Sequence, residues 1–336
     1  MSNDAMLDAA RTGDGVAFER LVSPFRRELR AHCYRMSGSL SDADDLLQES
    51  LIRAWKGLPS FEGRSALRTW LYKVTTSACL DALDKRSARL LPFDAGPAHD
   101  PTKPLGPPRP EITWLEPCPD DVWVDAPPSP EAKYGARESV ALAFLSMLQL
   151  LPPRQRAVLV LRDVLGWQAT ECAELLDMSV PAVNSALQRA RETLEGQRAI
   201  EHAHTPPGDA RTEDLLARYV RAWELADVPA LVSLLHEDAT LSMPPLSEWL
   251  QGAQIIGGAL SAMVLPPGSS GRFRLVATHA NGQPALAAYE RDAATGEMRA
   301  AAMHVLTISG GKVASLTAFV DPSLFTRFGL PSRLNG

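Results

Sequence analysis

The segment from Val180 to Glu195 places small and polar side chains on one face of an expected helix. A glutamine there can bind adenine through two hydrogen bonds, an arginine can bind guanine or a phosphate, and small residues let the helix approach base edges. The outward positions are Pro181, Ala182, Ser185, Gln188 and Arg189. Helix-turn-helix units also occur as plain packing modules, but this combination favours a helix that reads duplex DNA.

A second group, in the stretch FEGRSALRTWLYKV, interleaves aromatic rings with cations. Rings can stack on unpaired bases while cations hold the backbone, an arrangement that suits single-stranded DNA more than duplex. The group consists of Phe61, Arg64, Arg68, Trp70 and Lys73. Phe61 and Trp70 can equally be core residues at these spacings, so both interpretations stay open.

A third group lies in the last third of the chain, where polar and aromatic residues could line a pocket and a His/Asp pair could do acid–base chemistry. Isolated histidines in strands are more often satisfied core or surface residues, and no motif fixes a nucleophile, a metal or a phosphate. We therefore expect a regulatory, protein-contacting role ahead of ligand sensing, catalysis last, and no cofactor. The pocket candidates are His236, Asp238, Trp249, His279, Tyr289 and His304.

Helices must position the first two groups, and the first ninety residues have apolar residues at helical spacing almost throughout. In SLSDADDLLQESLIRAWKGL, Ser41 is the expected N-cap, followed by carboxylates where the helix dipole favours them. The apolar stripe is Ala43, Leu47, Leu51, Ala54 and Leu58, which leaves Asp45, Gln48, Glu49 and Arg53 on an exposed polar side.

The stretch from Leu151 to Glu195 predicts three helices in a helix-turn-helix arrangement. Pro152 and Pro153 set the start of the first helix, Gly166 ends it, and a short DMS turn divides the other two. Ser179 is the expected N-cap of the last helix. Its inward stripe is Val183, Leu187, Ala190 and Leu194.

From about Thr212 the pattern changes to helices followed by strands. Helices are expected over Thr212–Ala226, Val228–His236 and Ser247–Val264, and strand-like runs follow in RFRLVATHA, ALAAYERD, MHVLTISGG and KVASLTAFVD. Asn281-Gly282 and Gly310-Gly311 predict hairpin turns. A helix pair packed on a curved antiparallel sheet gives an α+β cone.

Length and charge divide the chain into several domains. With 336 residues and 45% apolar side chains, two or three compact units are expected. Residues 93–136 hold 8 acidic and 3 basic side chains and 11 of the 27 prolines, so 5 of the 6 excess negative charges lie there. The segments expected are residues 1–92, an acidic proline-rich linker 93–136, residues 137–204, and residues 205–336.

The cysteines and the apolar runs bear on the compartment. Four scattered cysteines show no spacing typical of a metal or redox site, and no apolar run reaches the roughly 20 residues that a membrane span requires. A reducing cytoplasm fits both observations, and no membrane partner is expected.

The second group, with the helices on either side of it, resembles region 2 of the extracytoplasmic-function sigma factors of bacterial RNA polymerase. The first group, with its helix-turn-helix, resembles region 4 of the same factors. The tail, with NGQPALAAY and AFVDPSLFTRFGLP, resembles the SnoaL-like extension of some of these factors. The resemblance implies a multidomain protein of two all-α domains followed by an α+β, cone-shaped SnoaL-like domain. The alternative is a SnoaL-type small-molecule enzyme or ligand sensor fused to a DNA-binding half.

The resemblance also implies partners and site residues. DADDLLQES is expected to dock on the β′ coiled coil of core polymerase, the β flap is a further contact, and promoter DNA is the other partner. Single-stranded DNA of the −10-type element is expected at Phe61, Arg64, Arg68, Trp70, Lys73 and Ser77. The −35-type element is expected at Pro181, Ala182, Ser185, Gln188, Arg189 and Arg191.

The linker resembles segments that thread the polymerase cleft, where acidic side chains can mimic phosphates. Glu111, Glu116, Asp120 and Asp121 would do so here, with Trp114 and Trp123 as anchors. The alternative is a solvated tether whose tryptophans pack on a neighbouring domain. The C-terminal domain is expected to regulate the sigma domains in cis, with Phe325, Phe328 and Leu330 as an apolar docking edge.

Overall fold

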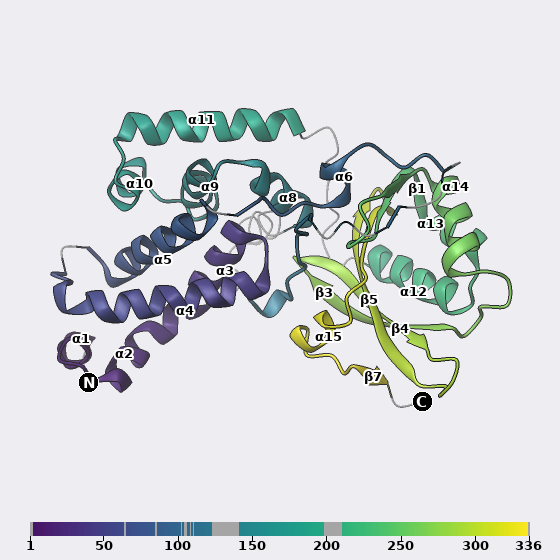
Figure 1. The fold of residues 1–336 in the computed structure, drawn as a ribbon, viewed down its shortest axis with the longest axis horizontal. Coiled ribbons are helices and arrows are strands. Elements are labelled where there is room, and N and C mark those ends of the chain that lie inside the picture. Colours follow the sequence, from purple (N-terminus) through teal and green to yellow (C-terminus); the bar gives the residue numbers. More distant parts are fainter. Residues whose placement is uncertain are drawn as a thin grey trace. The chain divides into compact units, whose positions relative to one another are not determined.

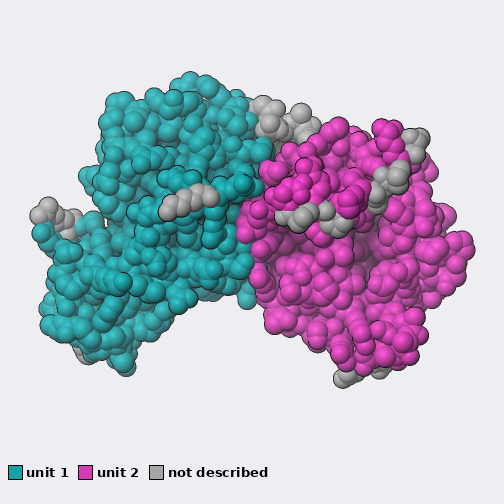
Figure 2. All heavy atoms as spheres, viewed as in Figure 1, with its two compact units in different colours: residues 1–88, 121–139, 143–199 teal, residues 89–120, 140–142, 200–336 magenta. Residues whose placement is uncertain are grey.

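The computed structural model describes residues 3–63, 65–84, 86–101, 103, 106–107, 109, 111–122, 141–197 and 210–334. The chain forms two compact units, which Figure 2 distinguishes by colour. Unit 1 comprises Met1–Ala88, Asp121–Ser139 and Ala143–Ala199, and unit 2 comprises Arg89–Asp120, Val140–Leu142 and Ile200–Gly336. Arg64 and Trp123 lie outside the described residues.

Unit 1 begins with five helices, here called the first helical domain. They are α1 (Asn3–Arg11), α2 (Gly15–Val22), α3 (Arg26–Ser37), α4 (Leu40–Gly57) and α5 (Leu67–Leu83). The apolar stripe expected on α4 is buried, which confirms its orientation. The expected N-cap was wrong by two residues: Ser39 caps the helix, because its side chain accepts a hydrogen bond from the Asp42 amide.

The rest of the described part of unit 1, called the second helical domain, contains the helix-turn-helix. Its elements are α8 (Leu142–Leu150), α9 (Pro153–Leu159) continued by a π-helix (Val160–Val164), α10 (Ala169–Leu176) and α11 (Val180–Gln197). Ser179 Oγ accepts a hydrogen bond from the Ala182 amide at 3.3 Å, which confirms the predicted N-cap. Asp177 ends α10 in the left-handed conformation, with φ at 51°, and so makes the tight turn.

Unit 2 contains helices packed on a mixed sheet. The helices are α12 (Ala210–Glu224), α13 (Val228–Leu234), α14 (Ala253–Ala259) continued by a π-helix (Leu260–Val264), and α15 (Leu324–Arg327). The strands are β1 (Leu235–Ser242), β2 (Trp249–Gln251), β3 (Phe273–Ala280), β4 (Gln283–Arg291), β5 (Met298–Ser309), β6 (Lys312–Phe319) and β7 (Arg333–Leu334). The sheet order is β2-β1-β6-β5-β4-β3, with β7 pairing β5.

Two details of this unit differ from the sequence prediction. The helix expected over Val228–His236 ends at Leu234, and the chain continues as β1, which pairs in parallel with β6. The helix expected from Ser247 begins only at Ala253, because β2 precedes it and pairs with β1. The hairpin turns are confirmed: Asn281, Gly282, Gly310 and Gly311 all have positive φ.

The core of unit 2 lies between α12 and the sheet (Figure 1). Leu215, Tyr219, Ala222 and Trp223 recur at helical spacing along α12 and are all buried. The opposite wall includes Leu286, Ala288 and Leu306 from β4 and β5. The described structure therefore supports the expected α+β cone.

Residues 89–120 pack with the C-terminal domain in unit 2, although the sequence placed most of them in a separate linker. The Leu90 amide donates to the Thr113 carbonyl at 3.0 Å, and the Leu115 amide donates to the Leu90 carbonyl at 2.9 Å. Short α6 (Pro92–Ala95) lies between these contacts in sequence. Backbone pairing gives this proline-rich segment an order that composition does not predict.

Two of the four cysteines lie close together, although they are 46 positions apart in the sequence. Cys33 and Cys79 are buried, with their sulfur atoms 3.8 Å apart, and Cys118 and Cys172 are buried as well. Burial raises the pKa of the Cys33 thiol, which makes the thiolate scarce. Among the helices that the structure describes, none has the length and apolarity to span a membrane.

Candidate functional site

The outward face of α11 carries the predicted base contacts. Pro181, Ser185, Gln188 and Arg189 are exposed and Ala182 is half-buried, whereas the inward Val183, Leu187 and Ala190 are buried. Asn184 is also exposed on this helix, and sequence reasoning missed it. The helix therefore presents small and polar side chains of the kinds that can contact base edges.

Arg191, the last predicted contact of α11, is held by a partner in its own domain. Its guanidinium donates to both carboxylate oxygens of Asp163, at 2.7 and 2.9 Å. These hydrogen bonds raise the pKa of Arg191. Gln188 is also engaged, donating to Glu192 at 2.9 Å one turn away on the exposed surface. Among the predicted contacts, Arg189 is therefore the cation to test first.

The predicted single-strand group gathers around α5. Phe61 is buried against Trp70, with ring centroids 5.0 Å apart. Arg68 donates to both carboxylate oxygens of Glu28, at 2.7 to 3.0 Å, and lies 5.0 Å over the ring of Tyr72. These hydrogen bonds to Glu28 raise the pKa of Arg68.

Further along α5, Lys73 and Ser77 are exposed positions of the predicted group, one turn apart. Lys73 Nζ donates to Asp177 Oδ1 at 3.0 Å and to the Glu174 carbonyl at 3.2 Å, both in the second helical domain. Sequence reasoning missed Glu28, Tyr72 and Asp177, since their proximity to these cations arises only in the folded chain.

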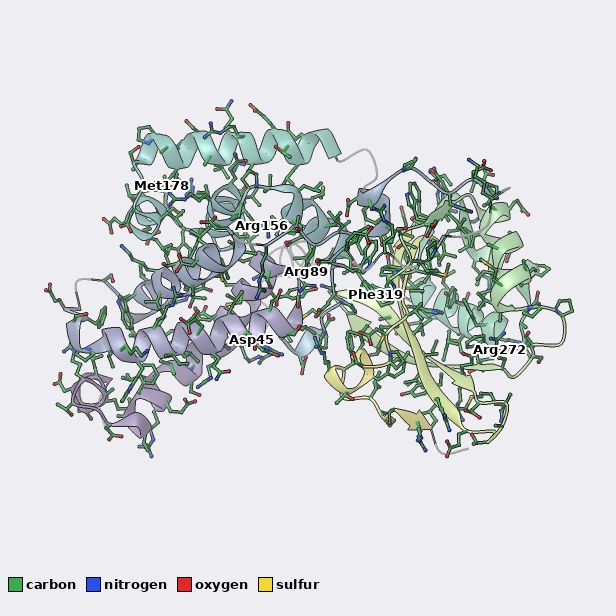
Figure 3. All side chains as sticks on the ribbon, viewed as in Figure 1. Asp45, Arg89, Arg156, Met178, Arg272 and Phe319 are labelled. Carbon is green, nitrogen blue, oxygen red and sulfur yellow. The ribbon has the colours of Figure 1, made fainter. Side chains whose placement is uncertain are left out.

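The polar side of α4 holds the residues expected to dock on polymerase. Asp45, Gln48 and Glu49 are exposed, and Figure 3 labels Asp45 on this helix. Arg53 binds Glu49 at 2.7 Å and Asp81 at 2.6 Å. Ile52 lies among them with 41% of its surface exposed, an apolar residue that the sequence pattern did not single out. Ile52 thus adds an apolar contact to an otherwise polar surface.

The six pocket candidates of the C-terminal domain do not gather at one place. His236 Nδ1 lies 2.7 Å from Asp238 Oδ1, but both side chains are largely exposed. Trp249 donates to the Gly96 carbonyl, and the Tyr289 hydroxyl donates to the Pro331 carbonyl. His279 is exposed on β3, while His304 is buried against α12.

The structure holds an open cleft of about 840 Å³ elsewhere in unit 2. Its lining includes the loop Gly268–Gly271, the ion pair Arg272–Glu290 and Arg299, and Figure 3 labels Arg272. None of the six pocket candidates lines it. Arg272 pairs with Glu290 and Arg299 with Asp292, while Arg291, which also lines the cleft, donates to the backbone carbonyls of Gly271 and Gly296.

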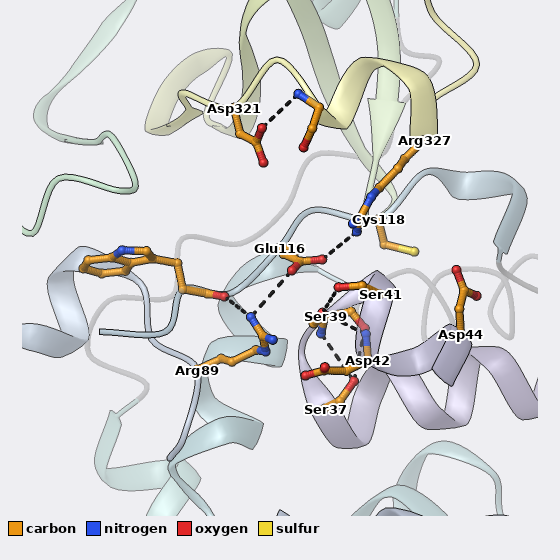
Figure 4. Close-up of polar contacts among 12 residues, drawn as sticks. Ser37, Ser39, Ser41, Asp42, Asp44, Arg89, Glu116, Cys118, Asp321 and Arg327 are labelled. Carbon is orange, nitrogen blue, oxygen red and sulfur yellow. Dashed lines mark hydrogen bonds and ion pairs between the residues drawn. The ribbon is translucent and has the colours of Figure 1, made fainter. Parts of the chain in front are cut away.

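The expected linker and the C-terminal tail meet at Glu116. Its carboxylate lies 3.0 Å from Arg327 and 3.6 Å from Arg89, as Figure 4 shows. Arg89 also donates to the Trp114 carbonyl at 2.9 Å. The Cys118 amide and carbonyl both pair with Asn281. This cluster fixes the segment to the C-terminal domain through charge and backbone hydrogen bonds together.

Family models match three stretches of the chain: Sigma-70 region 2 at residues 21–89, Sigma-70, region 4 at residues 141–194, and a SnoaL-like domain at residues 216–316. The ECF RNA polymerase sigma factor SigG of Mycobacterium tuberculosis is 47% identical over 327 residues, covering 96% of this chain and 86% of SigG. SigJ of the same species is 29% identical over 322 residues, covering 92% and 93%.

A solved structure gives the same result. The crystal structure of the Mycobacterium tuberculosis extracytoplasmic function sigma factor SigJ matches with a TM-score of 0.61 and 25% sequence identity, covering 92% of this chain and 100% of that chain. The three family matches and the similarity to SigG, which covers 96% of the chain, therefore agree with one another. The chain belongs to the extracytoplasmic-function (ECF) sigma factors of RNA polymerase.

Proposed function

We propose that this sigma factor binds core polymerase through the polar side of α4, melts the −10-type element with α5 and reads the −35-type element with α11. The main supporting observation is that Gln48 and Glu49 on α4 and Arg189 on α11 are exposed, while most of the apolar stripe of each helix is buried. Transcription from a linear promoter fragment with purified core polymerase, with and without the factor, is the direct test.

The first prediction concerns the core-binding surface. Replacing Gln48 and Glu49 together by alanine is expected to weaken binding to core polymerase about tenfold, because both side chains are exposed and central on the α4 surface. The fold should survive, since the lost Glu49–Arg53 pair is exposed and such pairs contribute about 0–1 kcal/mol. Fluorescence titration measures the affinity and circular dichroism the fold. Wild-type affinity with an intact fold would contradict the assignment.

The second prediction concerns promoter reading. Arg189→Ala is expected to lower the affinity for the −35-type element by about 1–3 kcal/mol if the guanidinium binds a base, and to reduce mainly the salt dependence if it binds a phosphate. Titrations of duplex DNA at several salt concentrations separate the two cases. Asn184→Ala, at another exposed position of the same helix, removes no charge, so it should leave the salt slope unchanged whatever its effect on the affinity. If Arg189→Ala alters neither the affinity nor the salt slope, Arg189 lies outside the interface.

For the C-terminal domain we propose regulation in cis, without catalysis, through the chain that joins the two helical domains. The supporting observation is that Glu116 and Asp120, two of the carboxylates expected in the polymerase cleft, are engaged within unit 2 by Arg327 and by the Gly282 amide. A segment held this way cannot simultaneously line the cleft. Phe325, which anchors the tail that carries Arg327, is the position whose substitution tests this regulation.

A further inference from the structure

The face of α5 that carries the proposed −10 contacts is covered within unit 1 by a tryptophan of the second helical domain. The Trp167 ring packs edge-on against Tyr72, with centroids 5.2 Å apart and planes at 61°. The Arg68 guanidinium lies 5.9 Å from the centroid of the same indole. Tyr72 has no exposed surface and Trp167 only 6%. An aromatic ring thus occupies the place where α5 offers a ring and a guanidinium.

The polar half of this contact lies further along α5. Lys73 Nζ is bound by the Asp177 carboxylate and the Glu174 carbonyl, at 3.0 and 3.2 Å. An ammonium held between anionic and carbonyl oxygens has the surroundings that a nucleic-acid backbone would give it. The second helical domain therefore supplies both an aromatic ring and an anionic group to α5.

The geometry of the second helical domain holds these two groups in place. Gly166 turns the chain with φ at 71°, and the Trp167 amide then donates to the Leu161 carbonyl at 3.0 Å. Arg162 donates to the Trp167 carbonyl. Asp177 sits in the tight turn after α10, and α10 packs on α5. Both groups are thus positioned by local structure, before any contact with α5.

Single-stranded DNA is held by ring stacking and by cations that grip its backbone, and those are the two interactions already satisfied here. We propose that Trp167 and Asp177 occupy the surface of α5 that single-stranded promoter DNA must reach, so that the second helical domain and the unpaired strand compete for it. This inference rests on the proposed role of Arg68 and Lys73 in −10 binding.

The rest of the contact between the two helical domains includes a buried cation. Arg156, labelled in Figure 3, is buried and donates to the carbonyls of Met36, Gln149 and Leu151, at the C-terminal ends of α3 and α8. The helix dipoles place partial negative charge there, which compensates the cation, and burial still lowers the pKa of Arg156 to about 10. A buried cation stabilises a contact less than apolar packing of the same volume would.

The Lys73–Asp177 ion pair contributes little free energy to the contact. Its side chains are 45% and 81% exposed, so solvent screens their attraction. Opening the contact loses a ring-ring contact, this screened ion pair, a few hydrogen bonds and the packing of α9 and α10 on α3 and α5. An unpaired strand can replace the ring contact and the ion pair in kind, and so offset part of that loss.

The experiment uses the full chain with dyes at Arg20→Cys on α2 and Glu195→Cys on α11, both exposed positions, while the native cysteines are buried. Energy transfer between the dyes reports the closed contact. Anisotropy of a short, fluorescein-labelled single strand of mixed-sequence DNA reports binding. Trp167→Leu removes the ring and keeps apolar volume, and Asp177→Asn removes the charge while asparagine still tolerates the left-handed turn.

Both variants are expected to lower energy transfer and to raise the affinity for the single strand, about tenfold for Trp167→Leu and about threefold for Asp177→Asn. Asp214→Asn, which removes a similarly exposed pair with Arg218 in unit 2, should change neither reading. Because Asp177 is a surface residue, its variant keeps the test valid even if Trp167→Leu perturbs the fold.

Other outcomes separate the inference from the function it rests on. Unchanged energy transfer in both variants overturns the occlusion, and if the wild type binds the single strand in that case, the −10 role of α5 stands. Lower energy transfer without binding of the single strand by any variant overturns the competition and contradicts the −10 role as well.

Discussion

Phe325→Ala is expected to lower the free energy of unfolding of unit 2 by about 3–5 kcal/mol, the range for truncating a buried phenylalanine. Phe325 lies on α15 with no exposed surface and packs edge-on against Tyr289, with ring centroids 5.0 Å apart. Tyr289 in turn donates to the Pro331 carbonyl at 2.9 Å, so the ring anchors the tail on β4. Loss of the phenyl group would leave a cavity between α15 and β4.

Hydrogen exchange of the β4 and β5 amides in urea measures this loss in unit 2 alone. Val320→Ala is the matched control, since it also shortens an apolar side chain near the tail but at a position 48% exposed. Its effect should stay within about 0.5 kcal/mol. Equal effects of the two substitutions would mean that Phe325 does not anchor the tail.

The same variant tests regulation in cis. Without its anchor, the tail no longer holds Arg327 against Glu116, and residues 89–120 lose one of their attachments to the C-terminal domain. Arg327→Gln removes the charge contact alone and should leave stability nearly unchanged, since the pair is partly exposed. Both variants should change transcription with core polymerase in the same direction. Wild-type transcription by both, at every concentration, would exclude this contact as a regulator.

Local signals were sufficient to predict the helix-turn-helix. Ser179 as N-cap, Pro181 in the first turn and the stripe from Val183 are all determined by neighbours within one or two turns of helix. The exposed face of α11 then follows from the 3.6-residue period. The same logic predicted the buried stripe of α4 and both hairpin turns.

The segments around β1 and β2 could not be predicted this way. The run from Val228 continues the helical spacing past Leu234, yet its later residues form β1 because β6 offers a parallel edge far along the chain. Strand pairing between distant segments overrides local propensity, and a single sequence gives no sign of the partner. The order of residues 89–120 has the same origin, since it depends on partners such as Asn281 and Arg327.

The same distinction between local signals and contacts of distant segments applies to the candidate sites. Exposed faces of single helices were predictable, because side-chain direction follows from spacing alone. The contacts of Tyr72 with Trp167 and of Lys73 with Asp177 join residues about a hundred positions apart, and the periodicity of either helix is compatible with core or surface at these positions. The dispersed pocket candidates reflect the same limit, since the strand that holds a histidine does not reveal which face is covered.

His304 gives the second large effect, which depends on pH. It is buried in β5, with Nδ1 3.3 Å from the Tyr219 hydroxyl and its ring centroid 4.8 Å from that of Trp223. Burial lowers the pKa of His304 from 6.5 to about 4. The unfolded chain therefore binds this proton more tightly than the folded chain does, and the stability of unit 2 should fall as the pH drops from 6.5 towards 4.

The full loss of folding free energy amounts to about 3 kcal/mol below pH 4, because a tenfold difference in proton affinity between the folded and unfolded chains corresponds to about 1.4 kcal/mol. His304→Gln keeps a group that can hydrogen-bond Tyr219 but cannot titrate, so this part of the pH dependence should disappear. His279→Gln, at an exposed position of β3, is the control and should leave it unchanged. His32 in the first helical domain is also buried, with its pKa lowered to about 3, so the measurement must follow amides of β4 and β5. If His304→Gln loses stability between pH 6.5 and 4 as steeply as the wild type, the imidazole is not buried in its neutral form, and the packing of α12 against β5 is wrong.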